Sequence, residues 1–160
     1  MKNEKIETVI RMRHVGIVVS NLSKAMNIFS NLFNLKLKMK PIMNEGKYIN
    51  TLVGLKNVKS KVCIFELPDK SRLELLEYMS PKGKKRSNKS NEIGVSHFAI
   101  TINNMDKFLK KSKKFNVQFV NKPILSEDKF VKVAYIKVLN EILIEIVEVL
   151  NKRADFSAGK

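Results

Sequence analysis

Cysteine, acidic residues and long apolar runs are all scarce in this sequence. A single cysteine, Cys63, excludes an intramolecular disulfide, and its place in an alternating apolar run indicates a small buried residue rather than a nucleophile. The apolar stretches, such as residues 15–19, fall far short of the roughly 20 residues of a membrane-spanning helix. The first ten residues contain no apolar signal-peptide segment. We therefore expect a cytoplasmic protein without a membrane span.

The shortage of acidic residues leaves a net charge of +16, which raises the question of nucleic-acid binding. The basic excess is diffuse, however, and its densest part, residues 81–90, has the Gly, Ser and Lys content of a solvated loop. The abundance of Lys, Asn and Ile together indicates a compositional bias of the genome. No recognition helix, zinc-finger spacing or aromatic RNA-binding motif accompanies the charge. We expect no nucleic-acid partner, although a positive field could attract a small anionic molecule.

The chain contains an internal repeat. Residues 14–37, HVGIVVSNLSKAMNIFSNLFNLKL, match residues 97–119, HFAITINNMDKFLKKSKKFNVQF, when one residue is dropped in the helical part. Each copy opens with histidine and continues as an alternating strand, a cap-like Ser-Asn or Asn-Asn pair and a helical stretch. Apolar residues at helical spacing should face the core: Leu22, Met26, Phe29 and Phe33 in the first copy, Met105, Phe108, Leu109 and Phe115 in the second.

A second, gap-free match links residues 61–77 with residues 132–148, and both segments have the pattern of a β-hairpin. Extended stretches near residues 47–53 and 117–125 would complete a β-α-β-β-β order in each half. With 160 residues, 44% apolar and 29% charged, one globular domain is expected.

The predicted fold class is therefore α+β, with tandem βαβββ modules that form a cupped eight-stranded mixed sheet. The predicted parts of the chain are a first module (12–80), a basic linker loop (81–92), a second module (93–150) and a polar tail (151–160).

Few polar residues repeat inside the predicted strands, and they are His14 with His97 and Glu74 with Glu145. Strand side chains alternate between faces, so Glu74 shares its face with Leu76 while Glu77 points to the other face. Glu145 and Glu148 are related in the same way. Glu77 and Glu148 are therefore rejected as site residues.

The two histidines share their strand face with small residues, Gly16 in the first copy and Ala99 in the second, which leaves room for a ligand. Buried imidazoles and carboxylates are costly unless they are paired or coordinate a cation. Two neutral imidazoles and two carboxylates suit Zn, Ni, Co, Mn or Fe(II). The repeat thus predicts one divalent-metal site built from His14, Glu74, His97 and Glu145.

At residues 12–150 the sequence resembles the vicinal oxygen chelate superfamily, which includes glyoxalase I, methylmalonyl-CoA epimerase, extradiol dioxygenases and the fosfomycin and bleomycin resistance proteins. The resemblance is carried by the motifs RHVGIVVSNLSKAMNIFSNLFNLKL, RLELLEY, VSHFAI and LIEIVE. The family's metal ligands correspond to the same four residues. A His-Glu-His-Glu set is similar to that of glyoxalase I and differs by one residue type from the epimerase set, whereas dioxygenases and fosfomycin enzymes typically use three ligands.

This resemblance implies a divalent-metal-dependent lyase or isomerase of the glyoxalase I (lactoylglutathione lyase) type. Such an enzyme acts through an enediolate on a small anionic substrate, with glutathione as a candidate cosubstrate. Glu145 is then the first choice of catalytic base and Glu74 of the acid that returns the proton, and a homodimer is expected.

Two alternatives stay open, a methylmalonyl-CoA-epimerase-like enzyme and a non-catalytic protein that binds small molecules or drugs. One departure from the family pattern is that residues 138–141, Val-Leu-Asn-Glu, replace a DPDG-like turn before the last strand.

Overall fold

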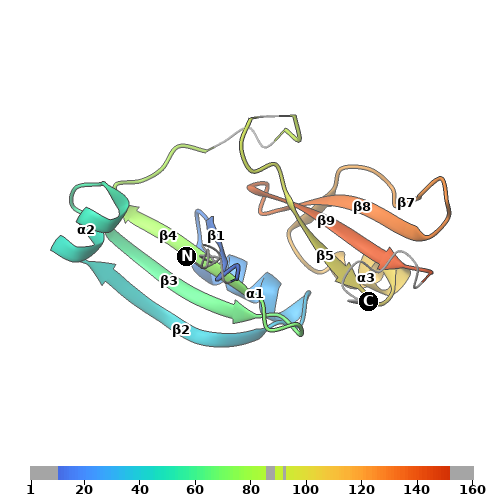
Figure 1. The fold of residues 1–160 in the computed structure, drawn as a ribbon, viewed down its shortest axis with the longest axis horizontal. Coiled ribbons are helices and arrows are strands. Elements are labelled where there is room, and N and C mark those ends of the chain that lie inside the picture. Colours follow the sequence, from blue (N-terminus) through green and yellow to red (C-terminus); the bar gives the residue numbers. More distant parts are fainter. Residues whose placement is uncertain (1–10, 86–88, 92, 152–160) are drawn as a thin grey trace, which may run out of the picture.

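The computed structural model describes residues 11–85, 89–91 and 93–151. The first ten residues, part of the predicted linker loop and the predicted tail beyond Asn151 lie outside this part of the chain. The described residues form two consecutive units of strands and helices, drawn at the two ends of the molecule in Figure 1.

The first unit contains four strands and two helices. In chain order they are β1 (Val15–Val18), α1 (Leu22–Asn31), β2 (Lys36–Glu45), α2 (Lys47–Val53), β3 (Lys59–Glu66) and β4 (Arg72–Ser80). The strands form one sheet in the order β1-β4-β3-β2, in which β1 is parallel to β4 and the other neighbours are antiparallel.

The second unit repeats this plan. It consists of β5 (Phe98–Ile102), α3 (Met105–Ser112), β6 (Val117–Phe119), β7 (Ile124–Leu125), β8 (Val131–Val138) and β9 (Ile142–Val149). Its sheet has the order β5-β9-β8-β6, with β7 also paired to β8. The predicted α+β fold with tandem βαβββ modules is confirmed. The strands form two mixed sheets, of four and five strands. The second sheet has five strands because the extended stretch at residues 117–125 is divided into β6 and β7.

The prediction of an extended stretch at residues 47–53 is wrong, because these residues form the helix α2. The third segment of the first unit is instead β2, which alternates polar and apolar residues over residues 36–40 and then becomes irregular from Pro41. Gly54 ends α2 in the left-handed conformation at φ 67°, which favours glycine. The Asn50 side chain then accepts a hydrogen bond of 2.8 Å from the backbone N–H of Val58 and connects α2 to the start of β3.

The predicted helix starts are confirmed by their caps. The side chains of Asn21 and Asn104 each accept a backbone hydrogen bond of 2.8 Å, from Lys24 and Lys107 respectively. Such a side chain satisfies one of the N–H groups that the first turn leaves without a partner, and it contributes about 1 kcal/mol.

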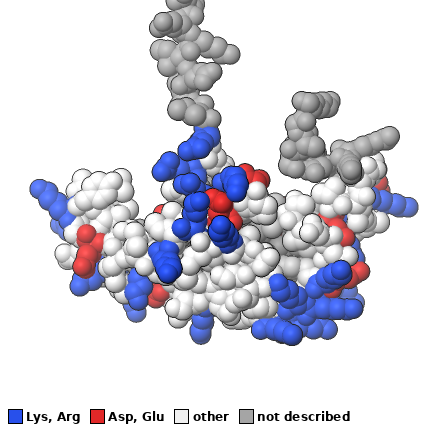
Figure 2. All heavy atoms as spheres, turned by 90° about the horizontal axis from the view of Figure 1, so that it is seen from below, with Lys and Arg blue, Asp and Glu red and all other residues white. Residues whose placement is uncertain are grey.

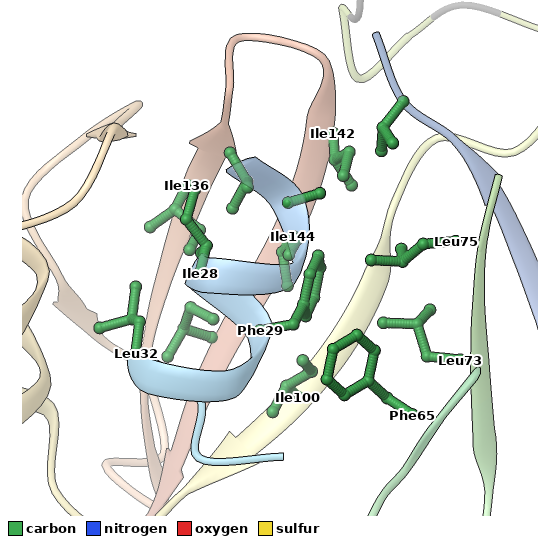
Figure 3. Packing of buried hydrophobic residues seen from close by; sticks show 14 of the residues in the cluster. Ile28, Phe29, Leu32, Phe65, Leu73, Leu75, Ile100, Ile136, Ile142 and Ile144 are labelled. Atoms are coloured by element: carbon green, nitrogen blue, oxygen red, sulfur yellow. The ribbon is translucent and has the colours of Figure 1, made fainter. Parts of the chain in front are cut away.

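Helix α1 packs between the two sheets and joins the two units into one hydrophobic core. Figure 3 shows Ile28 and Phe29 of α1 directed toward Ile136 and Ile144 of the second unit, while Phe65 approaches from the first. The rings of Phe29 and Phe65 are 6.1 Å apart. Burial of such side chains contributes about 1.5–3 kcal/mol each, so α1 fixes how the two units sit together.

Polar contacts reinforce this junction. Both the hydroxyl and the backbone N–H of Ser20 donate to the carboxylate of Glu141, in the turn between β8 and β9. The turn that departs from the family pattern therefore anchors the start of α1. In addition, the Lys111 ammonium donates to the carbonyl oxygen of Leu32 at 3.1 Å.

Basic side chains are spread over the surface. Figure 2 shows Lys and Arg scattered across the face in view, with fewer carboxylates among them. Within the described residues, no helix is both long and apolar enough to cross a membrane.

Candidate metal centre

The first predicted pair, His14 and Glu74, lies on adjacent strands of the first sheet. His14 directly precedes β1, and the register of the parallel pair β1-β4 sets Gly16 opposite Glu74. His14 Nε2 lies 3.5 Å from Glu74 Oε2, and the side chains are 38% and 21% exposed. The pair is thus formed, and solvent reaches both groups.

The second pair, His97 and Glu145, occupies the equivalent place in the second sheet. Here Ala99 pairs with Glu145 across the parallel strands β5 and β9. His97 Nε2 lies 3.1 Å from Glu145 Oε2, and the side chains are 31% and 24% exposed. The sequence repeat is therefore also a geometric repeat of an imidazole beside a carboxylate.

Small residues keep the face around each pair open, as the alternation of the strands predicts. A Cβ atom on Gly16 would lie 3.4 Å from Glu74 Oε2, in van der Waals contact with the carboxylate. Val18, on the same face of β1, is 56% exposed, whereas Val15 and Ile17 on the other face pack against the core. A ligand can approach the carboxylates from this face.

The rejected acids, Glu77 and Glu148, have a different role on the opposite face. Glu77 accepts a hydrogen bond of 2.8 Å from the backbone N–H of Leu22, the first residue of α1. Glu148 accepts one of 3.1 Å from Met105, the first residue of α3. Carboxylates are favourable at helix N-termini, so these two acids hold the helices on their sheets.

The structure brings the four predicted residues into two pairs but does not bring the pairs together within one chain. Among the described residues there is no group of three or more His, Cys, Asp or Glu side chains placed to hold one ion. Each pair supplies one imidazole nitrogen and one carboxylate oxygen, which is half of a four-ligand shell.

The neighbourhood of His97 defines which ring nitrogen is available to a ligand. The Ser96 hydroxyl donates its only proton to the carbonyl oxygen of Ser90 at 2.9 Å. Its oxygen, 3.2 Å from His97 Nδ1, can therefore accept a hydrogen bond from a protonated Nδ1. In the neutral ring with its proton on Nδ1, the lone pair is on Nε2, the nitrogen that faces Glu145. Histidines that bind metals are commonly fixed by a hydrogen bond of this kind.

Tyr135 is a site residue that the sequence reasoning missed. Its hydroxyl oxygen lies 3.1 Å from His97 Nε2, and the two rings meet edge to face at 4.9 Å. Tyr135 also pairs with Glu145 across β8 and β9, just as Ile64 pairs with Glu74 in the first sheet. The alignment of the two hairpins could have identified this residue, because a tyrosine lies opposite Glu145 where an isoleucine lies opposite Glu74.

The pKa of Tyr135 is raised above its ordinary value, mainly because burial disfavours the charged phenolate. The nearby Glu145 carboxylate raises this pKa further, because its charge repels the phenolate and because it accepts a hydrogen bond from the phenol. The phenol is therefore protonated at neutral pH and available as a hydrogen-bond donor. This donor distinguishes the second pair from the first.

A divalent cation fits the donor chemistry of the two pairs. Nε2 of His97 and a carboxylate oxygen of Glu145 lie 3.1 Å apart, a separation that a shared proton or a cation between them makes favourable. Imidazole nitrogen and carboxylate oxygen are ligands of Zn, Ni, Co, Mn and Fe(II). Each pair is accordingly suited to contribute two ligands.

Comparisons with known proteins agree with this architecture. Residues 13–135 match the family model described as the glyoxalase/bleomycin resistance protein/dioxygenase superfamily. A glyoxalase family protein from Bacillus cereus is 25% identical, with a TM-score of 0.82 over 94% of this chain and 99% of that one.

A fosfomycin resistance protein, FosX from Listeria monocytogenes, crystallised with Mn(II) and sulfate, is 18% identical with a TM-score of 0.57 over 88% of this chain and 93% of that one. The comparison with curated proteins gives no match.

Proposed function

The chain belongs to the glyoxalase/bleomycin resistance protein/dioxygenase superfamily, and from that premise we propose that it is a divalent-metal-dependent lyase or isomerase of the glyoxalase I type. The observation that carries the proposal is the pair of equivalent His–Glu contacts, His14 with Glu74 and His97 with Glu145. Their ligand types match a His-Glu-His-Glu shell. The bound Mn(II) of FosX supports a divalent ion in this fold.

The separation of the two pairs supports a shell that is shared between two copies of the chain. Within one chain the described residues offer at most two such ligands at each place. In a symmetric dimer, the His14–Glu74 pair of one copy can meet the His97–Glu145 pair of the other, which would give two equivalent four-ligand sites. The predicted homodimer would then be a requirement for metal binding.

A divalent ion at this site would supply Lewis acidity toward adjacent oxygens of an α-hydroxy carbonyl substrate. In the proposed reaction the Glu145 carboxylate removes the proton from the carbon beside the carbonyl, and the electron pair left behind moves to the carbonyl oxygen. Glu74 takes the proton of the hydroxyl group on that first carbon and delivers it to the former carbonyl carbon, while Glu145 gives its proton to the oxyanion. The carbonyl group is then on the first carbon and both carboxylates are regenerated. The protonated phenol of Tyr135 lies beside Glu145 and can donate to the oxygen on which charge accumulates.

Epimerisation of an acyl-CoA acid is the alternative reaction for the same residues. It uses the same proton removal beside a carbonyl, but the proton returns to the opposite face of the same carbon. The two reactions are therefore distinguished by assay. A non-catalytic binding protein would need neither the metal nor the carboxylates.

The test is metal content of the purified protein and of the variants His14→Ala and Glu145→Ala, followed by an assay of the metal-loaded enzyme with methylglyoxal and glutathione. Glu148→Gln is the matched control, because this acid lies on the same strand as Glu145 but faces α3. We expect one metal ion per chain in the wild type and the control, and loss of metal in both site variants. Turnover of the hemithioacetal would support the glyoxalase reaction, and metal without turnover would favour the epimerase. Absence of metal under every loading condition would refute the proposal.

A further inference from the structure

A cavity of about 530 Å³ lies beside the second His–Glu pair and shares Tyr135 with it. It is bounded by β8, by Leu143 of β9, by residues 120–121 and by the segment that leads to β5. The polar groups around it are Lys89, Ser90, Asn91, Asn121, Tyr135 and Lys137. All of these side chains can donate hydrogen bonds, and among the described lining residues there is no carboxylate.

Lys137 is one of the two lysines that line this cavity, and it has no counter-ion in the described part of the chain. Its neighbour across the strands is Leu143, which is buried. A half-buried lysine without a carboxylate partner is costly to desolvate, and a bound anion would remove that cost.

The first sheet shows the opposite arrangement at the equivalent position, because the hairpin alignment places Glu66 where the second sheet has Lys137. Glu66 pairs across the strands with Arg72. Its carboxylate lies 3.4 Å from both Lys38 and Lys70. The charge at this position is thus ion-paired in the first sheet, whereas Lys137 has no ion-pair partner among the described residues of the second. The repeat therefore places a lysine at the cavity where the first unit has an acidic residue.

The cavity and the His97–Glu145 pair are on one face of the second sheet. Tyr135 and Lys137 are two residues apart on β8 and therefore point to the same side, and Tyr135 is paired with Glu145. Ser90 lines the cavity and also accepts the hydrogen bond from Ser96 that orients His97. A small molecule in the cavity can extend directly to the candidate metal ligands.

We propose that this cavity binds an oxyanion group, carboxylate or phosphate, at one end of the substrate, with Lys137 as the main contact and Lys89 as the second cation. Tyr135 and the neighbouring amides supply the neutral donors. This inference rests on the proposed function, which supplies the reaction that the bound substrate would undergo. Binding of the anion itself requires no metal. Substrate specificity would then be determined mainly by the second unit.

The experiment is a titration of the metal-free protein with sodium phosphate and, separately, sodium acetate at constant ionic strength, followed by backbone amide NMR. Lys137→Met is compared with Lys132→Met, which removes the same charge from the same strand but on the opposite face, where Lys132 pairs with Asp106. Circular dichroism and thermal unfolding verify that both variants fold.

We expect saturable shifts at residues 89–91, 135 and 137, and an affinity about tenfold weaker in Lys137→Met, which corresponds to about 1.4 kcal/mol. Lys132→Met should bind as the wild type does. Tighter binding of phosphate would assign the site to phosphoryl or phosphonyl groups, and tighter binding of acetate would assign it to carboxylates. Shifts that do not saturate, or that weaken equally in both lysine variants, would overturn the inference. A protein that binds the anion but never binds metal would refute the proposed function and leave this inference standing.

Discussion

The hydroxyl oxygen of Ser96 lies 3.2 Å from Nδ1 of His97 and can only accept from it, because its proton is donated to Ser90. This contact favours a proton on Nδ1, and the neutral ring with that proton can bind a cation through Nε2. It also links the orientation of the histidine to the segment that precedes β5. Ser96 is therefore a positioning residue for the candidate metal centre.

Substitution Ser96→Ala should weaken metal binding without unfolding the protein. Loss of a partner that orients a ligating histidine typically costs about 10–100-fold in metal affinity. The affinity is measured by competition with a chromophoric chelator. Ser96→Thr keeps the hydroxyl and should restore binding, and an unchanged affinity in the alanine variant would show that the contact has no such role.

Substitution of two glutamates on β4 should affect metal binding and stability separately. Glu74 faces His14, whereas Glu77 accepts from the first N–H of α1. Glu77→Ala should lower the free energy of unfolding by about 1–2 kcal/mol and leave the metal content unchanged. Glu74→Ala should instead abolish metal binding and leave the free energy of unfolding of the metal-free protein nearly unchanged. Denaturant unfolding and elemental analysis of both variants test this, and metal loss in Glu77→Ala would contradict it.

The sequence was sufficient to predict the features that depend on periodicity. Alternation along the strands identified Glu74 and Glu145 as residues of the open face and rejected Glu77 and Glu148, which the structure places at the helix starts. The repeat itself predicted the tandem modules. These features are local, because the face of a side chain follows from its place in the strand.

Features that depend on tertiary arrangement were not predictable in this way. The contact of Tyr135 with His97 requires three strands in a defined register, and the distance between the two His–Glu pairs depends on how α1 packs between the sheets. The short helix α2 was missed because its β-branched and aromatic residues have strand propensity, while Gly46 and Gly54 bound it.

Stability at alkaline pH should depend on Cys63. Burial raises the pKa of this thiol from 9.0 to about 11, since the thiolate is disfavoured in the core of the first unit. A group with a raised pKa contributes stability that is fully present below its unfolded pKa and is lost as the pH rises through its folded value. The free energy of unfolding should thus decline between about pH 9 and 11, and the decline should be shallower in Cys63→Ala.

Urea unfolding at several pH values measures this slope. Tyr135→Phe is the control for another group whose burial raises its pKa. The contribution of Tyr135 is lost only above the pKa of an ordinary tyrosine, which is about 10. Cys63 should also resist thiol reagents at pH 8 in the folded protein. Rapid modification there would show that the thiol is not enclosed as the structure describes.

The division of the four candidate ligands into two pairs leads to a prediction about mixed dimers. If the shell is shared between copies, His14→Ala and His97→Ala should each abolish metal binding and activity when expressed alone. Coexpression of the two variants produces mixed dimers in which one site combines both substitutions and the other contains neither. With half of the dimers mixed and one of two sites intact, about a quarter of the wild-type metal content and activity should return. A shell built within one chain would be damaged in every copy, so no recovery after coexpression would exclude the shared arrangement.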